Sequence, residues 1–465
     1  MEFEQKAEEK KMSMSKNIAR LAVTAGLTAA LSFGGVMAPV TMAFADGATA
    51  TTNSIKINKN NENGDVTYKA YQIFKADVVD GTDGSGKVVS NIDWASPKAK
   101  DAVLNYLSNV PKSDITLSSS AQAAAKYLTD HVDGTGETTP IENDNLFNGL
   151  AKAVVKNVDQ TGSSFTTDDV FKPQDGNGNA LQGYYLFVTD ESTLSTDQEV
   201  KKNTGTSPIF AVVGDALVTV TEKTSIPTVV KKVRNDDGSD WADKADSQMG
   251  QQVEYKLTGT VASNIATFGT YHYEFSDKLS GGLTADANSV VVKIGNTTLS
   301  RNATLGLDTG YDVSIDDATN TLTVKFADLK AAANAASATL DGRSNVVVTY
   351  TAKLDHEKVD KVTVGGEGNP NSVKLIYSNN PMSNGKGESV SDTVRDYTYA
   401  LQLVKKDFDD NSKKLEGVEF TIKATGADEL ASGVEGTQFV QGDGSLGGDA
   451  HRFTTDSNGV ISVKG

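Results

Sequence analysis

Apolar and polar residues alternate over most of the segment 224–394, and this pattern constrains the fold more than any other feature of the chain. Alternation with a period of two is typical of β-strands that bury one face. The clearest runs are 253–257, 321–326 and 346–353. Turn-forming clusters such as 316–320 separate these runs, and one helical stretch, 328–337, interrupts the series. Many short alternating strands joined by turns predict a β-sandwich.

The regions on either side of this segment predict two further domains. Segment 46–223 mixes strand-like and helix-like runs: 54–57, 66–74 and 183–188 for strands, 98–107 and 121–128 for helices. Residues 382–394, rich in Ser, Gly and Asp, are interpreted as a linker before segment 395–465. A chain of 465 residues is long enough for about three domains. We therefore expect a mainly β protein of tandem immunoglobulin-like β-sandwich domains, with some helix in the first domain.

Residues 1–45 have the composition of a secretory signal peptide. A basic stretch, 10–16, precedes an apolar run, 21–36, and the small residues before Asp46 suit cleavage after Ala45. The apolar run is too short and too rich in glycine to favour a membrane span. The sequence therefore predicts an exported protein.

Composition and motifs argue against several classes of partner, cofactor and catalytic site. The chain has no cysteine, so an exported protein of this size uses no disulfides. Its net charge of −17 argues against nucleic acid and anionic membranes as partners, although acidity can also simply keep a secreted protein soluble. The histidines lack metal-ligand spacing, the acidic loop that begins at Asp407 lacks the glycine and final glutamate of a calcium loop, and no nucleophile-elbow or phosphate-loop motif occurs. We expect no metal, no cofactor and no turnover catalysis.

Three residues far apart in the sequence, Lys231, Asp277 and Asn371, form the most informative candidate site. A period of two places Lys231 on the apolar face of the strand 229–233 and Lys232 on the other face. Burial favours the neutral, nucleophilic amine of a lysine and the protonated form of an acid. Such an acid could polarise the Asn371 carboxamide and pass protons while ammonia leaves, because the fold holds the groups together. Lysines on strands and Asn-Pro turns are common, so these residues alone leave an ordinary solvated strand as the other interpretation.

Four segments around these residues resemble the second domain of the major backbone pilins that sortases assemble on Gram-positive bacteria. They are 226–233, 253–260, 270–283 and 368–379. The resemblance implies that Lys231 is the cross-linking lysine, Asp277 the catalytic acid and Asn371 the acceptor of an internal isopeptide bond. Lys232 and Asn379 are close enough in register to be the alternatives.

The flanking segments resemble the other domains of the same pilins, which implies collagen-adhesin A-type and B-type sandwiches. The runs 68–74 and 183–186 match the first domain, whereas 397–407 and 415–422 match the B-type domain that closes these proteins. By this resemblance Lys405 is the cross-linking lysine of the last domain. Because the sequence ends before the matching acid, acceptor asparagine and sorting motif, we interpret 395–465 as the start of an incomplete domain.

A further lysine matters for polymerisation. In these pilins, sortase joins a threonine of one subunit to a lysine near the end of the first domain of the next, often after a proline. The matching residue here is Lys223, with Glu222 in the place of the proline. Lys201 and Lys202 are the substitutes, and an exposed linker lysine without such a role is the alternative for all three.

These observations predict a structural shaft subunit of a covalently polymerised pilus, stabilised by autocatalytic Lys-Asn isopeptide bonds. The expected partners are identical subunits, the pilus sortase and accessory pilins, with host surface ligands as a further option. The expected location is the cell wall of a Gram-positive bacterium. A monomeric wall-anchored adhesin that binds host protein or glycan is the alternative, and a secreted hydrolase would require a convergent acid pair or triad in a cleft.

Overall fold

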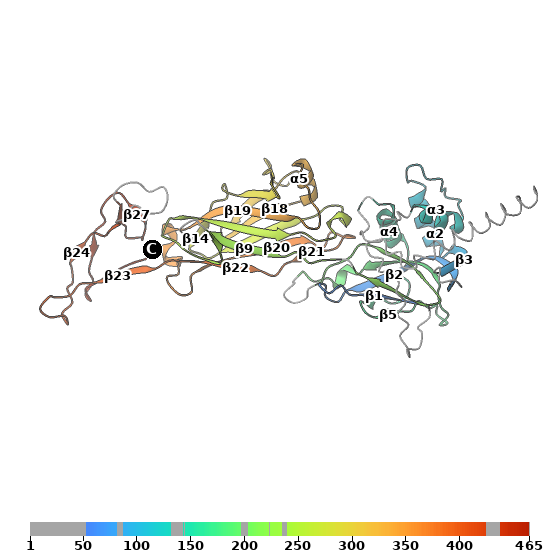
Figure 1. Cartoon of the computed structure of the whole chain (residues 1–465), viewed down its shortest axis with the longest axis horizontal. Helices are drawn as coiled ribbons and strands as arrows, with labels where there is room; N and C mark the ends of the chain where they lie inside the picture. Colours follow the sequence, from blue (N-terminus) through green and yellow to red (C-terminus); the bar gives the residue numbers. More distant parts are fainter. Residues whose placement is uncertain are drawn as a thin grey trace, which may run out of the picture. The chain divides into compact units, whose positions relative to one another are not determined.

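The computed structural model describes residues 53–80, 87–131, 143, 145–196, 203–222, 224–234, 240–424 and 438–464 (Figure 1). The chain divides into two compact units. Unit 1 comprises the described residues up to Ile226, together with Ala262–Gly269 and Ser378–Gly387, and unit 2 comprises the remainder. The domain boundaries expected after residues 223 and 394 stay predictions.

Unit 1 is built on two β-sheets. A five-stranded antiparallel sheet has the order β3-β2-β6-β7, with β4 paired to β2. A three-stranded sheet has the order β5-β1-β8, in which β1 and β8 run parallel. The strands are β1 (Ser54–Asn58), β2 (Thr67–Asp80), β3 (Lys87–Trp94), β4 (Phe165–Thr166), β5 (Val170–Phe171), β6 (Gly183–Thr189), β7 (Ile209–Val213) and β8 (Leu217–Thr221).

Three helices cover one face of the larger sheet. They are α2 (Pro97–Leu107), α3 (Ala121–Asp130) and α4 (Leu146–Asn157). Each begins after a capping residue, Ser96, Ser120 or Asn145, whose side chain accepts a hydrogen bond from a backbone N–H of the first turn. Their apolar faces pack on residues of β2 and β6, while the other face of that sheet packs on β1 and β8. The helices expected near 98–107 and 121–128 are therefore confirmed, and α4 is an addition.

Unit 2 is dominated by two seven-stranded sheets. The first has the order β10-β9-β12-β19-β15-β16, with β14 paired to β19; the second has the order β11-β22-β20-β13-β18-β17, with β21 paired to β20. The first contains β9 (Val229–Arg234), β10 (Trp241–Ala242), β12 (Gln252–Thr260), β14 (Leu283–Ala285), β15 (Val291–Ile294), β16 (Thr297–Thr298) and β19 (Asn345–Leu354). The second contains β11 (Lys244–Asp246), β13 (Tyr273–Leu279), β17 (Asp312–Asp316), β18 (Thr321–Phe326), β20 (Asn369–Ser378), β21 (Lys386–Glu388) and β22 (Asp392–Tyr397).

The alternating sequence pattern explains why the two sheets bury one face each. In β12, β18, β19 and β20, buried residues alternate with partly exposed ones along nearly the whole strand. The helical interruption expected in this segment is α5 (Leu329–Ala335), and the short helix η3 spans His356–Lys361. The expected mainly β architecture is thus confirmed. Within the described residues, no helix is both long and apolar enough to cross a membrane.

The segment after β22 forms small sheets with a small core. Its strands are β23 (Ala400–Val404) paired with β29 (Val460–Lys464), β24 (Glu419–Phe420) paired with β28 (Phe453–Thr454), and β25 (Lys423–Ala424), β26 (Gln438–Val440) and β27 (Leu446–Gly447) in one sheet. Its buried apolar residues are Phe453, Ile461 and Val463. This segment therefore has far less buried apolar surface to stabilise it than the two large sheets have.

Candidate functional site

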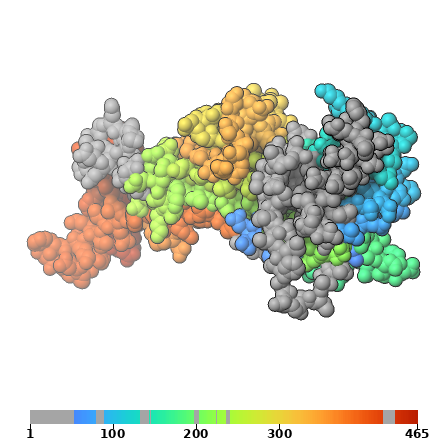
Figure 2. Space-filling view, turned by 45° about the vertical axis from the view of Figure 1, so that its right-hand side comes forward, coloured from blue at the N-terminus to red at the C-terminus, as the bar shows by residue number. Residues whose placement is uncertain are grey.

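Lys231 lies in the interior of unit 2, on the inward face of β9. The strand alternates as the sequence pattern predicts: Val229, Lys231 and Val233 are buried, whereas Val230 is exposed and Lys232 is half-buried. The Lys231 side chain has no solvent exposure. In the space-filling view, side chains cover the visible face of unit 2, drawn in green to orange (Figure 2). A lysine is rarely buried to this degree unless a charged or polar partner accompanies it.

Asp277 and Asn371 come from the second sheet and face Lys231. Asp277 lies on β13 and Asn371 on the adjacent β20, where Leu279 pairs with Asn371 and Asp277 pairs with Val373. The two side chains are therefore diagonal neighbours on one face of an antiparallel pair. Both are fully buried. The site thus joins the two sheets, with the lysine on one and the acid and amide on the other.

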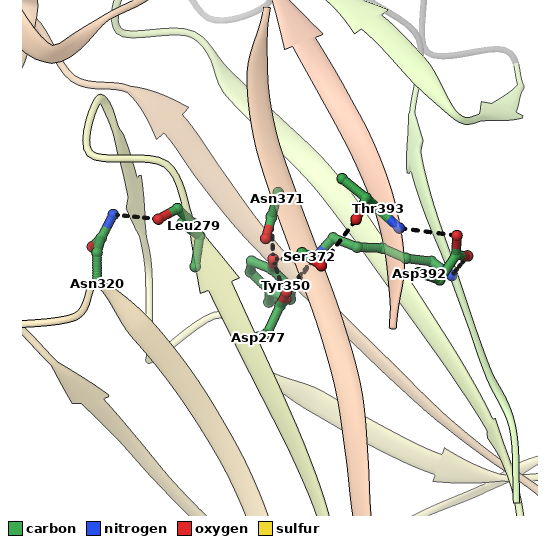
Figure 3. Close-up of polar contacts among 9 residues, drawn as sticks. Asp277, Leu279, Asn320, Tyr350, Asn371, Ser372, Asp392 and Thr393 are labelled. Carbon is green, nitrogen blue, oxygen red and sulfur yellow. Dashed lines mark hydrogen bonds and ion pairs between the residues drawn. The ribbon is translucent and has the colours of Figure 1, made fainter. Parts of the chain in front are cut away.

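Hydrogen bonds connect the four polar groups of the site, and Asn371 is bonded to Tyr350 alone among them (Figure 3). Lys231 Nζ lies 2.5 Å from both Asp277 carboxylate oxygens and 3.1 Å from the Tyr350 hydroxyl. The Tyr350 hydroxyl donates to Asp277 Oδ2 at 2.6 Å and accepts a hydrogen bond from Asn371 Nδ2 at 2.7 Å. Asn371 Oδ1 is buried and has no hydrogen-bond partner among the described residues. Tyr350 therefore bridges the acid and the carboxamide.

Two stacked tyrosines form the wall of the site beside the lysine. Tyr255 and Tyr350 are directly opposite each other on β12 and β19, with ring centroids 5.3 Å apart and an interplanar angle of 13°. Lys231 Nζ lies 5.3 Å from the Tyr255 ring centroid and 5.5 Å from that of Tyr350. Both rings are fully buried. They remove water from the amine and supply weak cation–π attraction in its place.

Burial sets the electrostatics of the site. Removal from water lowers the pKa of Lys231 to about 8, against the opposing effect of the Asp277 charge. Burial, followed by the charge of Asp277, raises the pKa of Tyr350 well above its usual value, so its hydroxyl keeps its proton. The lysine can therefore become a neutral amine, which is the nucleophilic form, far more readily than an exposed lysine. A nucleophilic amine, a carboxyl group and a carboxamide, here linked through the Tyr350 hydroxyl, are the groups that amide transfer requires.

A backbone contact holds the lysine strand in position. The Lys231 N–H donates to Asp392 Oδ2 at 2.7 Å, and Asp392 begins β22 in the opposite sheet (Figure 3). Next to it, Thr393 and Ser372 join β22 to β20 through a hydroxyl pair at 2.9 Å. The site therefore rests on regular strands, which hold side chains more rigidly than loops do.

The alternative residues of the predicted cross-link lie elsewhere. Lys232 points to the outer face of its sheet and forms an ion pair with Asp243 at 2.5 Å. Asn379 belongs to unit 1, where its carbonyl accepts hydrogen bonds from Thr204 Oγ1 at 2.6 Å and Gly205 N at 2.7 Å. Neither contacts the group around Lys231.

The structure says less about the remaining lysines that the sequence predicts to be functional. Lys405 directly follows β23 and is half-buried, with its N–H donating to the Gly459 carbonyl at 2.7 Å. The polymerisation lysine Lys223 and its substitutes Lys201 and Lys202 lie outside the described residues. So do the cleavage-site residues Ala45 and Asp46. Among the residues the structure does describe, no group of three or more histidine or acidic side chains could hold a metal ion.

Sequence reasoning missed Tyr350 and Tyr255. The alternation in 346–353 was a usable signal, because it places Tyr350 on the buried face of its strand. It could not show that the hydroxyl would lie between Asp277 and Asn371, since strand order and register determine that. Tyrosines in such strands are ordinary core residues in most β-sandwiches.

Unit 1 contains an apolar cavity beside its helices. Its lining residues are Ile73, Phe74, Ala125, Leu128, Thr129, Phe147, Tyr184, Tyr185, Phe210, Ala211 and Val212. None of these is an acid, a histidine or a lysine. This cavity therefore does not supply the acid pair that a hydrolase would require.

Comparisons with known proteins find similarity in solved structures. No family model and no curated protein matches the chain. The T6 backbone pilin of serotype M6 Streptococcus pyogenes is similar with 16% identity and a TM-score of 0.48, over 89% of this chain and 74% of that one. The major pilin SpaA of Corynebacterium diphtheriae, described with stabilising isopeptide bonds, has 14% identity and a TM-score of 0.42, with 89% and 84% covered. The major pilin BcpA of Bacillus cereus has 13% identity and a TM-score of 0.40, with 90% and 85% covered. These three solved structures are all of major or backbone pilins.

Proposed function

We propose that this chain is a structural shaft subunit of a covalently polymerised cell-surface pilus, and that its unit 2 is hardened by an autocatalytic isopeptide bond between Lys231 and Asn371. The observation that carries the proposal is the fully buried contact of Lys231, Asp277 and Asn371 through Tyr350. The sequence segments that resemble backbone pilins contain the same three residues. An ordinary buried ion pair needs no carboxamide with an unpaired buried oxygen beside it.

The reaction replaces one amide by another. Neutral Lys231 Nζ attacks Asn371 Cγ, a new C–N bond forms, the Cγ–Nδ2 bond breaks, and ammonia leaves. Asp277, within 2.5 Å of the amine, gives up one proton toward the leaving nitrogen and takes one from the attacking nitrogen. The leaving nitrogen gains one proton, so no outside reactant is needed. The proximity of the reacting groups in the buried site supplies the rate, and the reaction occurs once in each molecule.

The position of the bond suits a load-bearing role. Lys231 lies on β9, the first strand of one sheet along the chain, and Asn371 lies on the late strand β20 of the other sheet. A bond between them ties the two sheets and carries tension past the 140 residues that separate them in sequence. Extension of the chain would then not unfold the sandwich.

Polymerisation forms the second part of the proposal. A pilus sortase would join identical subunits at Lys223, and accessory pilins would complete the fibre on the wall of a Gram-positive bacterium. The resemblance of the segment 218–223 to the pilin lysine motif supports this site. Sortase-dependent ladders that disappear with Lys223→Ala are the expected result. Ladders that persist would refute Lys223, and the complete absence of ladders in the parent would favour a monomeric adhesin.

Intact mass tests the internal bond directly. Purified residues 46–465 are expected to be one ammonia lighter than the calculated chain, whereas Lys231→Ala and Asp277→Ala are expected at their calculated masses. Lys232→Ala is the matched control, because this neighbour faces outward and pairs with Asp243. It should retain the ammonia deficit. A parent protein at its calculated mass would remove the isopeptide bond from the proposal.

A further inference from the structure

The Tyr350 hydroxyl occupies the one position in the site that touches all three proposed reactants. It lies 2.6 Å from Asp277 Oδ2, 2.7 Å from Asn371 Nδ2 and 3.1 Å from Lys231 Nζ. In contrast, none of the described hydrogen bonds joins Asp277 directly to Asn371. A proton that passes from the acid to the leaving nitrogen therefore has a direct path through this hydroxyl.

We infer that Tyr350 is a catalytic residue of the bond-forming reaction, which carries a proton from Asp277 to the leaving nitrogen of Asn371. This inference rests on the proposed isopeptide function. It adds a fourth chemical group to the three that the sequence identifies. It also assigns a role to the only hydroxyl that is hydrogen-bonded to the carboxamide among the described residues.

Both hydrogen bonds of the Tyr350 hydroxyl reverse direction in such a transfer, since at rest the hydroxyl donates to Asp277 Oδ2 and accepts from Asn371 Nδ2. Before reaction, the amide nitrogen of Asn371 can only donate, and the tyrosine oxygen accepts its hydrogen. When Lys231 Nζ adds to Cγ, the former amide nitrogen becomes tetrahedral and acquires a lone pair that can accept a proton. Tyr350 then gives its proton to that nitrogen while it takes one from Asp277 Oδ2. Lys231 returns one proton to Asp277 Oδ1, so the acid, the tyrosine and the total proton count are restored as ammonia leaves.

The surroundings keep the hydroxyl available for this role. The ring is fully buried and stacked on Tyr255, so its orientation is held by packing. Its high pKa means that the resting state is a protonated phenol that both donates and accepts. Packing already holds the hydroxyl oxygen in place, so only hydrogens have to move during the reaction, which favours catalysis.

The test compares two single-oxygen deletions among the buried tyrosines of unit 2. Residues 46–465 of the parent, Tyr350→Phe and Tyr377→Phe are translated in a cell-free system, the synthesis is stopped, and the loss of ammonia is followed by intact mass over time. Tyr350→Phe keeps the ring and is expected to slow bond formation about 10²-fold or more, the usual contribution of a general acid–base group. Tyr377→Phe also keeps its ring. Tyr377 is buried on β20, the strand of Asn371, but its hydroxyl has no hydrogen-bond partner among the described residues, so the parent rate is expected.

The outcomes separate this inference from the proposed function. A parent that never loses ammonia overturns the proposed bond itself. If the parent and Tyr350→Phe react at the same rate, only the role of Tyr350 is overturned. If the two Tyr→Phe variants slow the reaction equally, the effect comes from packing of the core, and the role of Tyr350 is again overturned. Near-ultraviolet circular dichroism checks that the variants fold. If Tyr350→Phe does not fold, the parent is measured in D₂O: slower ammonia loss supports proton transfer in the reaction, and an unchanged rate contradicts it.

Discussion

Glu222 in unit 1 and Asp277 in unit 2 are both buried carboxyl groups. Most of the side chains around them are of the same types, but one type differs. Glu222 in unit 1 accepts hydrogen bonds from the Tyr68 hydroxyl at 2.7 Å, from Asn63 Nδ2 at 3.0 Å and from the Asn60 N–H at 3.2 Å. Asp277 in unit 2 likewise has a tyrosine as its partner, and an asparagine lies one hydroxyl away. The difference is a lysine: Asp277 contacts a buried amine, whereas no described lysine donates a hydrogen bond to Glu222.

The comparison teaches that an acid, a tyrosine and an asparagine together make a structural cluster, and that a buried amine makes the cluster reactive. The lysine beside the Glu222 group, Lys59, is half-buried and forms an ion pair with Asp65 at 2.8 Å, which raises the pKa of Lys59. Such a lysine stays charged and has no nucleophilic lone pair. Asn63 also differs from Asn371. The Asn63 carboxamide oxygen accepts a hydrogen bond from Thr204 N at 2.9 Å, whereas the buried Asn371 Oδ1 has no hydrogen-bond partner among the described residues.

The largest expected contrast is in stability, after truncation of the two asparagines. Asn371→Ala should lose the cross-link over 140 residues, at a cost of ~5 kcal/mol in the free energy of unfolding in the chain-entropy model. Asn63→Ala should cost about 1–3 kcal/mol, because it leaves buried partners unsatisfied but breaks no covalent bond. Guanidinium unfolding of both variants and the parent measures the difference. Equal losses of unfolding free energy in the two variants would contradict a covalent bond at Asn371.

The next effect concerns the pH dependence of bond formation, which has no counterpart at Glu222. The reaction as proposed needs one proton on the Lys231–Asp277 pair, and the pKa of Lys231 is lowered to about 8 by burial. Below that pH Lys231 holds this proton, and above it the proton is lost. The rate of ammonia loss should therefore be level below about pH 8 and fall about tenfold per pH unit above it.

Cell-free translation and a chase at several pH values would give this profile by intact mass. A rate that instead rises up to about pH 8 and then levels would mean that Asp277 acts as a carboxylate base on the neutral amine. That result would be consistent with the isopeptide bond but would contradict the role of Asp277 as an acid. The Lys232→Ala variant should show the parent profile, because Lys232 lies on the outer face of the sheet.

The sequence could predict much of unit 2 because a period of two constrains each strand strongly. Alternation placed Lys231 on the buried face, and resemblance selected Asp277 and Asn371 from many similar residues. It could not reveal Tyr350, since the contact depends on which strands become neighbours and in which register. A shift of one residue in β19 would turn that hydroxyl to the outside of the sheet.

Unit 1 was less predictable for the same physical reason. Glu222 was noticed only as a departure from a proline, yet it is buried and hydrogen-bonded by residues about 160 positions earlier in the chain. Local pattern carries no information on contacts of that separation. The helix α4 was also missed, although Asn145 caps its first turn. Segments such as 262–269 and 378–387 belong to unit 1 while their flanking strands belong to unit 2, although the sequence indicated only a linker over part of the second segment.

The smallest effect is expected from Glu222→Gln, which tests whether this cluster is only structural. Burial raises the pKa of Glu222 above its usual value, so the folded state holds the proton more tightly than the unfolded state. Stability of the parent should then fall as pH rises from the ordinary glutamate pKa toward the raised one, by at most about 1.4 kcal/mol per pH unit for a single proton. Glutamine does not titrate, so the variant should lack this slope while the ammonia deficit persists. A lost deficit in Glu222→Gln would break the comparison, because it would make the carboxyl group of unit 1 necessary for the chemistry of unit 2.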